Sequence, residues 1–224
     1  MKQDRDASKK SAGEKAAGYV TDGMILGLGT GSTVRYFMEK LAEKIKEDSL
    51  NVAGVPTSAA TEKLAKALNI PLTSLSECEG IDLDVDGADE VDAGFNLLKG
   101  GGGAHTREKI VAGASRRFIV IVDAEKVVGR IGAFPVAIEA LPFAEAPVMK
   151  GVIELGGLPR KREGFLTDNG NIVLDARFNI IDAEALEEDL KSIPGVVESG
   201  IFAKRRPEKV IVGDGNKTKE MERE

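Results

Sequence analysis

The span Asp86–Lys109 concentrates the residue types that carry out proton transfer. Its chemically competent residues are the acids Asp86, Asp89, Glu90 and Glu108, the cation Lys99 and the four consecutive glycines Gly100 to Gly103. Carboxylates accept and return protons, and an ammonium group with exposed backbone N–H groups stabilises negative charge on a reacting oxygen. Four glycines lose much backbone entropy on folding, so packing alone does not explain why the sequence contains them. The span therefore predicts proton transfer beside an anionic substrate.

Each of these residues also has a purely structural interpretation. Asp86 and Asp89 could bond their own backbone in a turn, and Glu108 could compensate a helix dipole. Lys126 alone would be an ordinary surface lysine. The proximity of Lys99 and the glycines favours a functional role for the two aspartates, whereas the pattern alone leaves Glu108 open between the two interpretations.

A second motif, Gly27–Thr33, reads GLGTGST between a predicted strand and a predicted helix. Its glycines let the backbone curl, and Ser32, Thr33 and the N–H groups of a helix start are suited to hold an anion. Ser32 occupies the third glycine position of a dinucleotide fingerprint, and no Gly-Lys-Ser/Thr follows as in a Walker loop. We interpret the motif as a phosphate-binding loop rather than a plain capped turn.

The sequence argues against most metal sites. Asp82, Asp84 and Asp86 imitate the opening of a calcium loop, but the twelfth position is Ala93, where a bidentate Glu belongs. A magnesium site at these acids stays open as a weak alternative. One Cys and one His are too few for a zinc site of Cys and His ligands. We predict neither a metal nor an organic cofactor.

Composition narrows the class of protein. The chain has 224 residues, 42% of them apolar, which is enough for a sizeable core. It has no apolar run of about 18 residues, and the N-terminus lacks the apolar centre of a signal peptide. We therefore expect a cytoplasmic protein that does not bind membranes. A net charge of -6 and the absence of Trp argue against a nucleic-acid surface.

The first half of the chain alternates helices and strands, which predicts a parallel sheet covered on both faces. The expected strands are 24–28, 51–55, 81–85 and 118–122, and the expected helices are 4–20, 33–48, one capped by Ser58, and 106–114.

The second half has the order strand, helix, two strands, helix, strand of a ferredoxin-like unit. The expected strands are 135–141, 164–167, 172–176 and 196–203, with helices 146–155 and 183–193 and a hairpin turn at 168–171. Residues 210–212 should return to the first sheet, and the last eight residues read as a solvated tail. The predicted class is α/β. A Rossmann-like domain comprises 1–131 and 206–224, and a smaller ferredoxin-like α+β domain comprises 132–205.

Several motifs together resemble the type A ribose-5-phosphate isomerase family. The matching segments are 27–33, 57–64 (TSAATEKL), 86–90 (DGADE), 99–102 (KGGG), 106–110 (TREKI), 123–126 (DAEK) and 167–171 (TDNGN). They span nearly the whole chain. The chain departs from the family pattern at Gly103, where a larger residue such as Ala is common, and this should loosen the loop.

The resemblance implies interconversion of ribose 5-phosphate and ribulose 5-phosphate in the pentose phosphate pathway, without a cofactor, by a homodimer or homotetramer. Glu108 matches the family's base, and Asp86, Asp89 and Lys99 match residues that bind and polarise the sugar. The implied substrate-binding residues are Thr30, Gly31, Ser32, Thr33, Gly87, Ala88, Gly100, Gly101, Gly102, Lys126 and an N-terminal lysine, Lys9 or the adjacent Lys10.

Two other function classes stay open. An amino-sugar deaminase or lactonase on a similar fold is expected to use a catalytic histidine, and the lone His105 beside the glycine loop argues against both. A non-catalytic sugar-phosphate sensor would need a partner or DNA-binding domain, for which no residues remain, and it would have no reason to retain Glu108 with Lys99.

Overall fold

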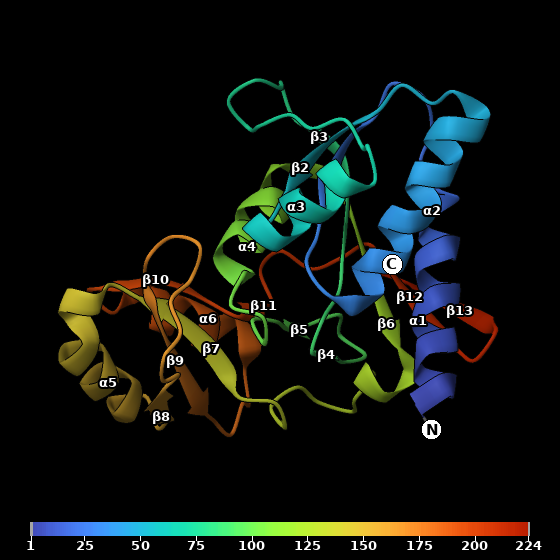
Figure 1. The fold of residues 1–224 in the computed structure, drawn as a ribbon. Coiled ribbons are helices and arrows are strands. Elements are labelled where there is room, and N and C mark those ends of the chain that lie inside the picture. The colour runs from blue at the N-terminus through green and yellow to red at the C-terminus, as the bar shows by residue number, and fades with distance from the viewer. Residues whose placement is uncertain (1, 224) are drawn as a thin grey trace. The chain divides into compact units, whose positions relative to one another are not determined.

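The computed structural model describes the backbone of residues 2–223 and the side chains of residues 5–223, and its backbone packs into two compact units (Figure 1). The first unit contains the residues up to 88, 110–127 and those from 207 onward. The second contains 89–109 and 128–206. The predicted boundaries near 131 and 206 lie close to these, but the prediction assigned 89–109 to the first domain.

A six-stranded sheet forms the centre of the first unit, in the order β13-β12-β6-β3-β1-β2. Its strands are β1 (Ile25–Leu28), β2 (Ala53–Pro56), β3 (Ile81–Asp86), β6 (Ser115–Asp123), β12 (Lys209–Asp214) and β13 (Lys217–Glu222). All neighbours are parallel except β12 and β13. The mostly parallel sheet and the return of the chain through β12 are therefore confirmed.

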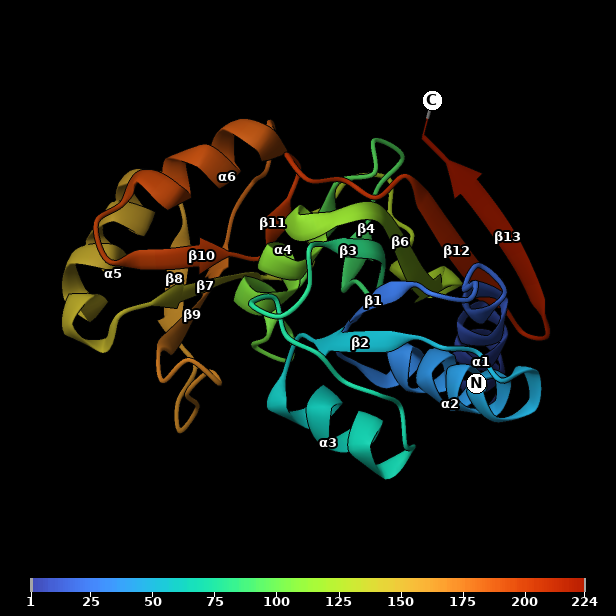
Figure 2. The ribbon, with the colours of Figure 1, turned by 90° about the horizontal axis from the view of Figure 1, so that it is seen from above.

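Helices α1 (Lys2–Ala17) and α2 (Ser32–Asp48) pack side by side against this sheet (Figures 1 and 2). Alternate strand residues such as Leu26, Leu28 and Leu83 are fully buried in the core that these helices cover. Helix α3 (Ala59–Ala67) begins at Ser58, whose side chain accepts a hydrogen bond from the Thr61 N–H, as predicted. Such a cap satisfies an N–H group that the helix itself leaves unpaired.

Gly27 of β1 and Gly29, which follows this strand, make room for the aspartates of β3. Gly27 pairs in register with Asp84, and a Cβ at Gly27 would lie 2.4 Å from Asp84 Oδ1. A Cβ at Gly29 would lie 2.2 Å from Asp86 Oδ1. The glycine motif and the strand of alternating aspartates are thus complementary parts of one packing arrangement.

The second unit is built on a four-stranded antiparallel sheet in the order β10-β7-β9-β8. Its elements in chain order are β7 (Val136–Ala140), α5 (Glu145–Glu154), β8 (Leu158–Lys161), β9 (Ile172–Arg177), α6 (Ala183–Ser192) and β10 (Val196–Ser199). Both helices contribute to one core with the sheet, through Val148, Val152 and Leu190. The predicted strand-helix-strand-strand-helix-strand unit is confirmed.

A small three-stranded sheet, β11-β5-β4, completes the second unit. It consists of β4 (Glu90–Val91), β5 (Leu97–Leu98) and β11 (Ile201–Phe202). Helix α4 (His105–Ala114) follows β5, and the division between the units falls within it, after residue 109. Two short 3-10 turns are η1 (Ala124–Lys126) and η2 (Pro142–Ala144).

Three predicted elements are wrong. Residues 164–167 are not a strand, and Gly164 has φ +66. Strand β9 pairs instead with β7 on one side and with β8 on the other. As an edge strand, β8 tolerates Pro159. The expected strand 196–203 is divided at Gly200 into β10 and β11, which belong to different sheets. The C-terminal tail forms β13 rather than a solvated end.

Over residues 2–223, no helix is long and apolar enough to cross a membrane.

Candidate active site

Lys99 and Glu108 form a buried ion pair in the second unit. Lys99 directly follows β5, and Glu108 lies in the first turn of α4. Lys99 Nζ is 3.1 Å from Glu108 Oε2, and the two side chains are only 3% and 6% exposed. An adjacent ammonium stabilises the negative charge of a carboxylate. The pair therefore places a carboxylate and an ammonium together where most water is excluded.

The glycine loop turns the chain between these two residues. Gly100 has φ +106, a conformation that favours glycine, and its carbonyl accepts a hydrogen bond of 3.0 Å from the Gly103 N–H. The Gly101 N–H donates to Asp89 Oδ2 at 2.8 Å. The structure thus brings Asp89 and the loop together. Gly103 has φ +73, and a Cβ there would lie 2.3 Å from Phe165 Cζ, so Phe165 fills the space of a larger residue.

A buried carboxylate that the sequence prediction missed holds the start of α4. Glu139 of β7 is 0% exposed and accepts hydrogen bonds from the Thr106 hydroxyl at 2.5 Å and the Asn171 amide at 2.7 Å. Thr106 donates to Oε2, whereas Asn171, Thr167 and Asn169 all donate to Oε1. Burial acts to raise the pKa of Glu139, but these four donors lower it below its usual value. The only signal in the sequence was one acid within an otherwise apolar strand, VAIEA.

In the first unit, Asp86 fastens the phosphate-loop candidate to β3. Its Oδ1 atom accepts hydrogen bonds from the Thr30 N–H at 3.0 Å and the Gly87 N–H at 2.7 Å. The Thr30 hydroxyl lies 2.8 Å from both the Thr57 and the Ser58 hydroxyls. The structure therefore brings Asp86, Thr30 and Gly87 together, and it adds Thr57 to the hydroxyl groups beside Thr30. Ala88, the last residue of this turn, is half-buried.

The loop ends where α2 begins. Gly31 is the N-cap residue, so no side chain caps α2, and its first turn contains no acid. Ser32 is exposed and Thr33 is buried. N–H groups at such a helix start, together with the helix dipole, attract anions. The start of α2 thus has neither a side-chain cap nor an acid in its first turn, which makes it a candidate for binding an anion.

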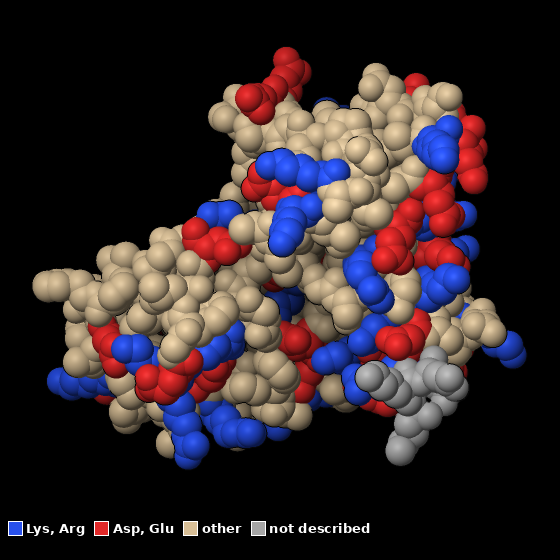
Figure 3. Space-filling view, viewed as in Figure 1, with Lys and Arg blue, Asp and Glu red and all other residues tan. Residues whose placement is uncertain are grey.

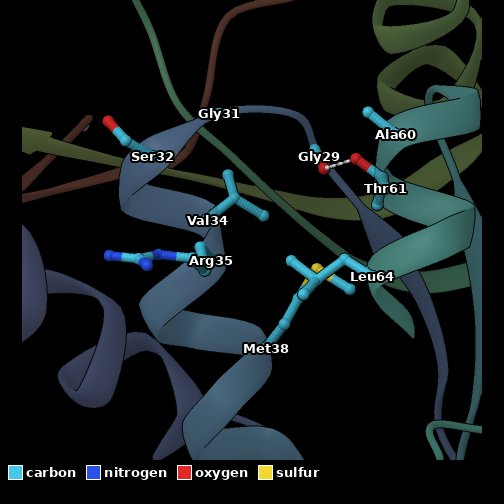
Figure 4. A pocket seen from close by; sticks show the side chains of 9 residues that line it. All are labelled: Gly29, Gly31, Ser32, Val34, Arg35, Met38, Ala60, Thr61 and Leu64. Carbon is cyan, nitrogen blue, oxygen red and sulfur yellow. Dashed lines mark hydrogen bonds between the residues drawn. The ribbon is translucent and has the colours of Figure 1, made fainter. Parts of the chain in front are cut away.

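A pocket of about 320 Å³ lies beside this turn, between α2 and α3 (Figure 4). Val34, Met38 and Leu64 form its apolar part, and Thr61 bonds the Gly29 carbonyl at its rim. The Ser32 side chain points away from this apolar part (Figure 4). Gly31 and Ser32 of the turn and Arg35 of α2 also line this pocket, so polar groups and a cation border its apolar part.

Two predicted lysines also belong to the first unit. Lys126 is the last residue of η1. Lys9 lies on α1, one turn after Arg5. Arg5 pairs with Glu125 of η1 at 3.2 Å, so α1 contacts the turn that contains Lys126. Within the described side chains, neither Lys9 nor Lys126 forms an ion pair, whereas Lys10 lies 3.7 Å from Glu14.

His105 is 0% exposed, and its Nε2 lies 3.3 Å from the Glu198 carbonyl oxygen. Burial lowers its pKa to about 4, so the imidazole is neutral at neutral pH. Among the described residues, no three His, Cys, Asp or Glu side chains are grouped as metal ligands.

Comparison with known proteins assigns the family. Residues 53–217 match the family model described as ribose 5-phosphate isomerase A (phosphoriboisomerase A). The chain belongs to the ribose 5-phosphate isomerase A family. It is 48% identical over 212 residues to a ribose-5-phosphate isomerase A of Legionella pneumophila, covering 93% of this chain and 95% of the relative. It is 50% identical over 202 residues to that of Methanothermobacter thermautotrophicus, covering 87% of this chain and 89% of the relative.

Solved structures of the family share the fold. The ribose 5-phosphate isomerase A of Methanocaldococcus jannaschii aligns with a TM-score of 0.93 and 41% identity, covering 96% of this chain and 98% of that one. A D-ribose-5-phosphate isomerase in complex with phospho-erythronic acid aligns with the same TM-score, identity and coverage. The family and fold expected from the sequence are therefore confirmed.

Proposed function

We propose that the protein interconverts D-ribose 5-phosphate and D-ribulose 5-phosphate through an enediolate, as a cofactor-independent isomerase of the pentose phosphate pathway. Membership of the family supports this function. Within the structure, the observation that carries it is the buried pair of Lys99 and Glu108, which flanks a glycine loop anchored on Asp89.

The proposed base is Glu108. Aldose-ketose isomerisation removes a proton beside a carbonyl and returns it to the neighbouring carbon, and one carboxylate can do both. Glu108 is 5% exposed, so solvent competes little for the proton that it carries. Lys99, 3.1 Å away, pairs with the carboxylate and can donate to the sugar oxygen as it becomes negative.

The proposed oxyanion donors include the glycine loop. The Gly101 N–H is used by Asp89, while the N–H of Gly102 makes no hydrogen bond to any described residue. An N–H group held ready before the reaction stabilises developing charge without a reorganisation cost. We assign the Gly102 N–H to the enediolate oxygen and Asp89 to a sugar hydroxyl.

The phosphate is assigned to groups of the first unit. They are the turn Thr30 to Thr33 with its uncapped helix start, and the lysines Lys9 and Lys126. The absence of an acid partner for Lys9 among the described residues supports it over Lys10. Asp86, Gly87 and Ala88 are assigned to the sugar. Binding a remote phosphate aligns the reacting carbons with the base.

The histidine-dependent alternatives lose support from the burial of His105. A side chain that is 0% exposed and held at the Glu198 carbonyl is poorly placed to serve as a substrate-contacting acid or base. A non-catalytic sensor would bind the sugar phosphate without converting it. Turnover of ribose 5-phosphate separates these classes.

The decisive experiment compares Glu108→Gln with Glu154→Gln. The first keeps size and removes the base, and loss of a general base costs about 10²- to 10⁴-fold in rate. The second makes the same change at an exposed residue of α5 that pairs only with Lys150. Near-normal isomerisation by Glu108→Gln would reject Glu108 as the base, and an inactive wild type would reject the function. Full activity after exhaustive dialysis against a chelator is expected.

The remaining proposals concern partners and location. We expect a homodimer or homotetramer, supported by exposed apolar side chains in the second unit such as Phe143 (99%) and Ile181 (83%). Acidic and basic side chains intermix over the face in Figure 3, which supports a sugar-phosphate enzyme rather than a nucleic-acid binder. We expect the protein in the cytoplasm and unattached to membranes. Light scattering and cell fractionation test these expectations.

A further inference from the structure

Arg162 contacts the glycine loop from the outside, and neither the sequence nor the reaction chemistry assigned it a role. It directly follows β8, the edge strand of the antiparallel sheet. Its Nη2 donates to the Gly100 carbonyl at 3.1 Å, and its Nη1 donates to the Gly101 carbonyl at 3.2 Å. One guanidinium therefore holds two successive peptide groups of the loop.

The guanidinium is itself fixed in place. Its Nε and Nη2 donate to the two oxygens of Asp175 on β9, at 2.9 and 2.6 Å, in a bidentate pair. Its Cζ lies 5.1 Å from the centre of the Phe165 ring, the ring that also packs against Gly103. The Arg162 side chain is 19% exposed. Because the bidentate geometry orients the planar group, Arg162 presents its remaining donors to the loop in one orientation.

Holding a carbonyl also orients the next N–H group. In a planar trans peptide the C=O and the following N–H point in opposite directions. With the Gly100 and Gly101 carbonyls turned toward Arg162, the N–H groups of Gly101 and Gly102 point away from it. The Gly101 N–H accordingly donates to Asp89 at 2.8 Å, and the Gly102 N–H makes no hydrogen bond to any residue that the structure describes. Hydrogen bonding to a carbonyl also polarises its peptide group and strengthens the opposite N–H as a donor.

We propose that Arg162, held by Asp175, is a positioning residue that orients and polarises the glycine loop so that the Gly102 N–H stabilises the enediolate oxygen. This inference rests on the proposed isomerase function for its catalytic consequence. It assigns to Arg162 no contact with the substrate. Its effect should therefore appear in the stabilisation of the enediolate much more than in the binding of ribose 5-phosphate, whose reacting carbonyl is uncharged.

The test compares Arg162→Met with Lys161→Met. Lys161 is the neighbouring cation of the same hairpin, but it pairs with Glu145 at 2.6 Å and does not contact the loop. For Arg162→Met we expect kcat to fall about 10- to 100-fold, since misplacing a catalytic group by about 1 Å lowers the reaction rate by about 10²-fold. KM for ribose 5-phosphate should change less than about threefold. Arg162→Lys should recover part of kcat, and Lys161→Met should match the wild type.

Two further measurements separate positioning from a general loss of structure. Phospho-erythronic acid carries a carboxylate in place of the reacting carbons, so its inhibition constant should rise with the fall in kcat. Amide hydrogen exchange across residues 99–105 should accelerate in Arg162→Met and not in Lys161→Met. The double variant Arg162→Met with Asp175→Met avoids leaving a lone charge in a largely buried place, and should show the same loss of kcat.

The proposal is overturned if Arg162→Met keeps kcat within twofold of the wild type, or if Lys161→Met loses as much. It is also overturned if inhibition by phospho-erythronic acid is unchanged while kcat falls. Wild-type protein without isomerase activity would reject the proposed function and the catalytic part of this inference. Hydrogen exchange would still decide whether Arg162 orders the loop, because that measurement needs no substrate.

Discussion

The ammonium of Lys99 lies 3.1 Å from Oε2 of Glu108, and both side chains are at most 6% exposed. Removing one partner of a buried ion pair leaves the other charge uncompensated, at a cost of about 3–5 kcal/mol, whereas replacing both partners is often much cheaper. The two residues should therefore be coupled in stability as well as in the proposed chemistry.

We predict that Lys99→Met destabilises the fold by about 3–5 kcal/mol and that adding Glu108→Gln restores part of this loss. Urea unfolding of the two single variants and the double variant measures the coupling. Replacement of the exposed pair Lys150 and Glu154 supplies the control, because surface pairs contribute only about 0–1 kcal/mol. Additive effects of Lys99→Met and Glu108→Gln would contradict the prediction.

A second prediction concerns Gly29, against which Asp86 packs. An added Cβ would lie 2.2 Å from Asp86 Oδ1, the atom that holds the Thr30 and Gly87 N–H groups. Gly29→Ala should therefore cost about 1–3 kcal/mol, the usual range for overpacking. It should also raise KM for ribose 5-phosphate, because the proposed phosphate turn must move with Asp86.

The control for Gly29→Ala is Gly113→Ala. Gly113 lies within α4, and a Cβ there would have no atom within 4 Å. Alanine in a helix is favoured over glycine by about 0.5–1 kcal/mol, so this variant should be more stable than the wild type. Relative to the wild type, the melting temperature should fall in Gly29→Ala and rise in Gly113→Ala. If Gly29→Ala were as stable as the wild type, the Asp86 side chain would have another acceptable position.

The parallel sheet was predictable because its strands carry their signal locally. Leu83 and Val85 alternate with Asp82 and Asp84, and runs of this kind end at turns that the sequence also marks. The site residues that come from such turns, Thr30 and Asp86, were found for the same reason. The family resemblance added Glu108, which its position in a helix start left ambiguous.

The residues that were missed act across long separations in sequence. Arg162 and Glu139 reach the loop and the start of α4 through a second sheet, and a single charged residue in a strand does not reveal its partner. Strand β13 was missed because its sequence, KTKEME, is almost entirely polar. It is stabilised by hydrogen bonds from Lys209, Tyr19 and Lys15, which lower the pKa of Glu220 to about 2.

The single histidine provides a third prediction. Burial lowers the pKa of His105 to about 4 from a usual 6.5. Between these values the unfolded chain binds a proton that the folded protein does not, so stability is complete above pH 6.5 and falls as the pH drops toward 4. A shift of this size corresponds to about 3 kcal/mol. Because the chain has one His, its imidazole NMR signals are unambiguous and should titrate near pH 4.

The matched variant for this prediction is His105→Gln, whose amide can still donate to the Glu198 carbonyl. Its stability, measured by denaturant unfolding between pH 6.5 and 4, should depend less on pH than that of the wild type. An imidazole that titrates near pH 6.5 would show that the ring is solvated in solution and would remove the basis of the prediction.

The last prediction concerns Glu139, which ties the start of α4 to the turn 167–171. Oε1 accepts three hydrogen bonds and Oε2 accepts one, and Glu139→Gln removes the negative charge that strengthens all four. A hydrogen bond to a charged group contributes about 1.5–3 kcal/mol, against about 0.5–1.5 kcal/mol for a neutral one, so we expect a loss of stability of about 1–3 kcal/mol. Because Thr106 lies two residues before Glu108, kcat should fall as well.

Glu163→Gln is the control, since it makes the same change at an exposed position of the same hairpin and should alter neither property. The pH dependence gives an independent check. The four hydrogen bonds lower the pKa of Glu139 despite its burial, so its contribution is complete above the unfolded value of 4.5 and is lost as the pH falls below it. Below pH 4.5 the wild type and Glu139→Gln should therefore converge in stability. Curves that stay parallel down to pH 3 would mean that the Glu139 carboxylate is not what binds the turn to the helix.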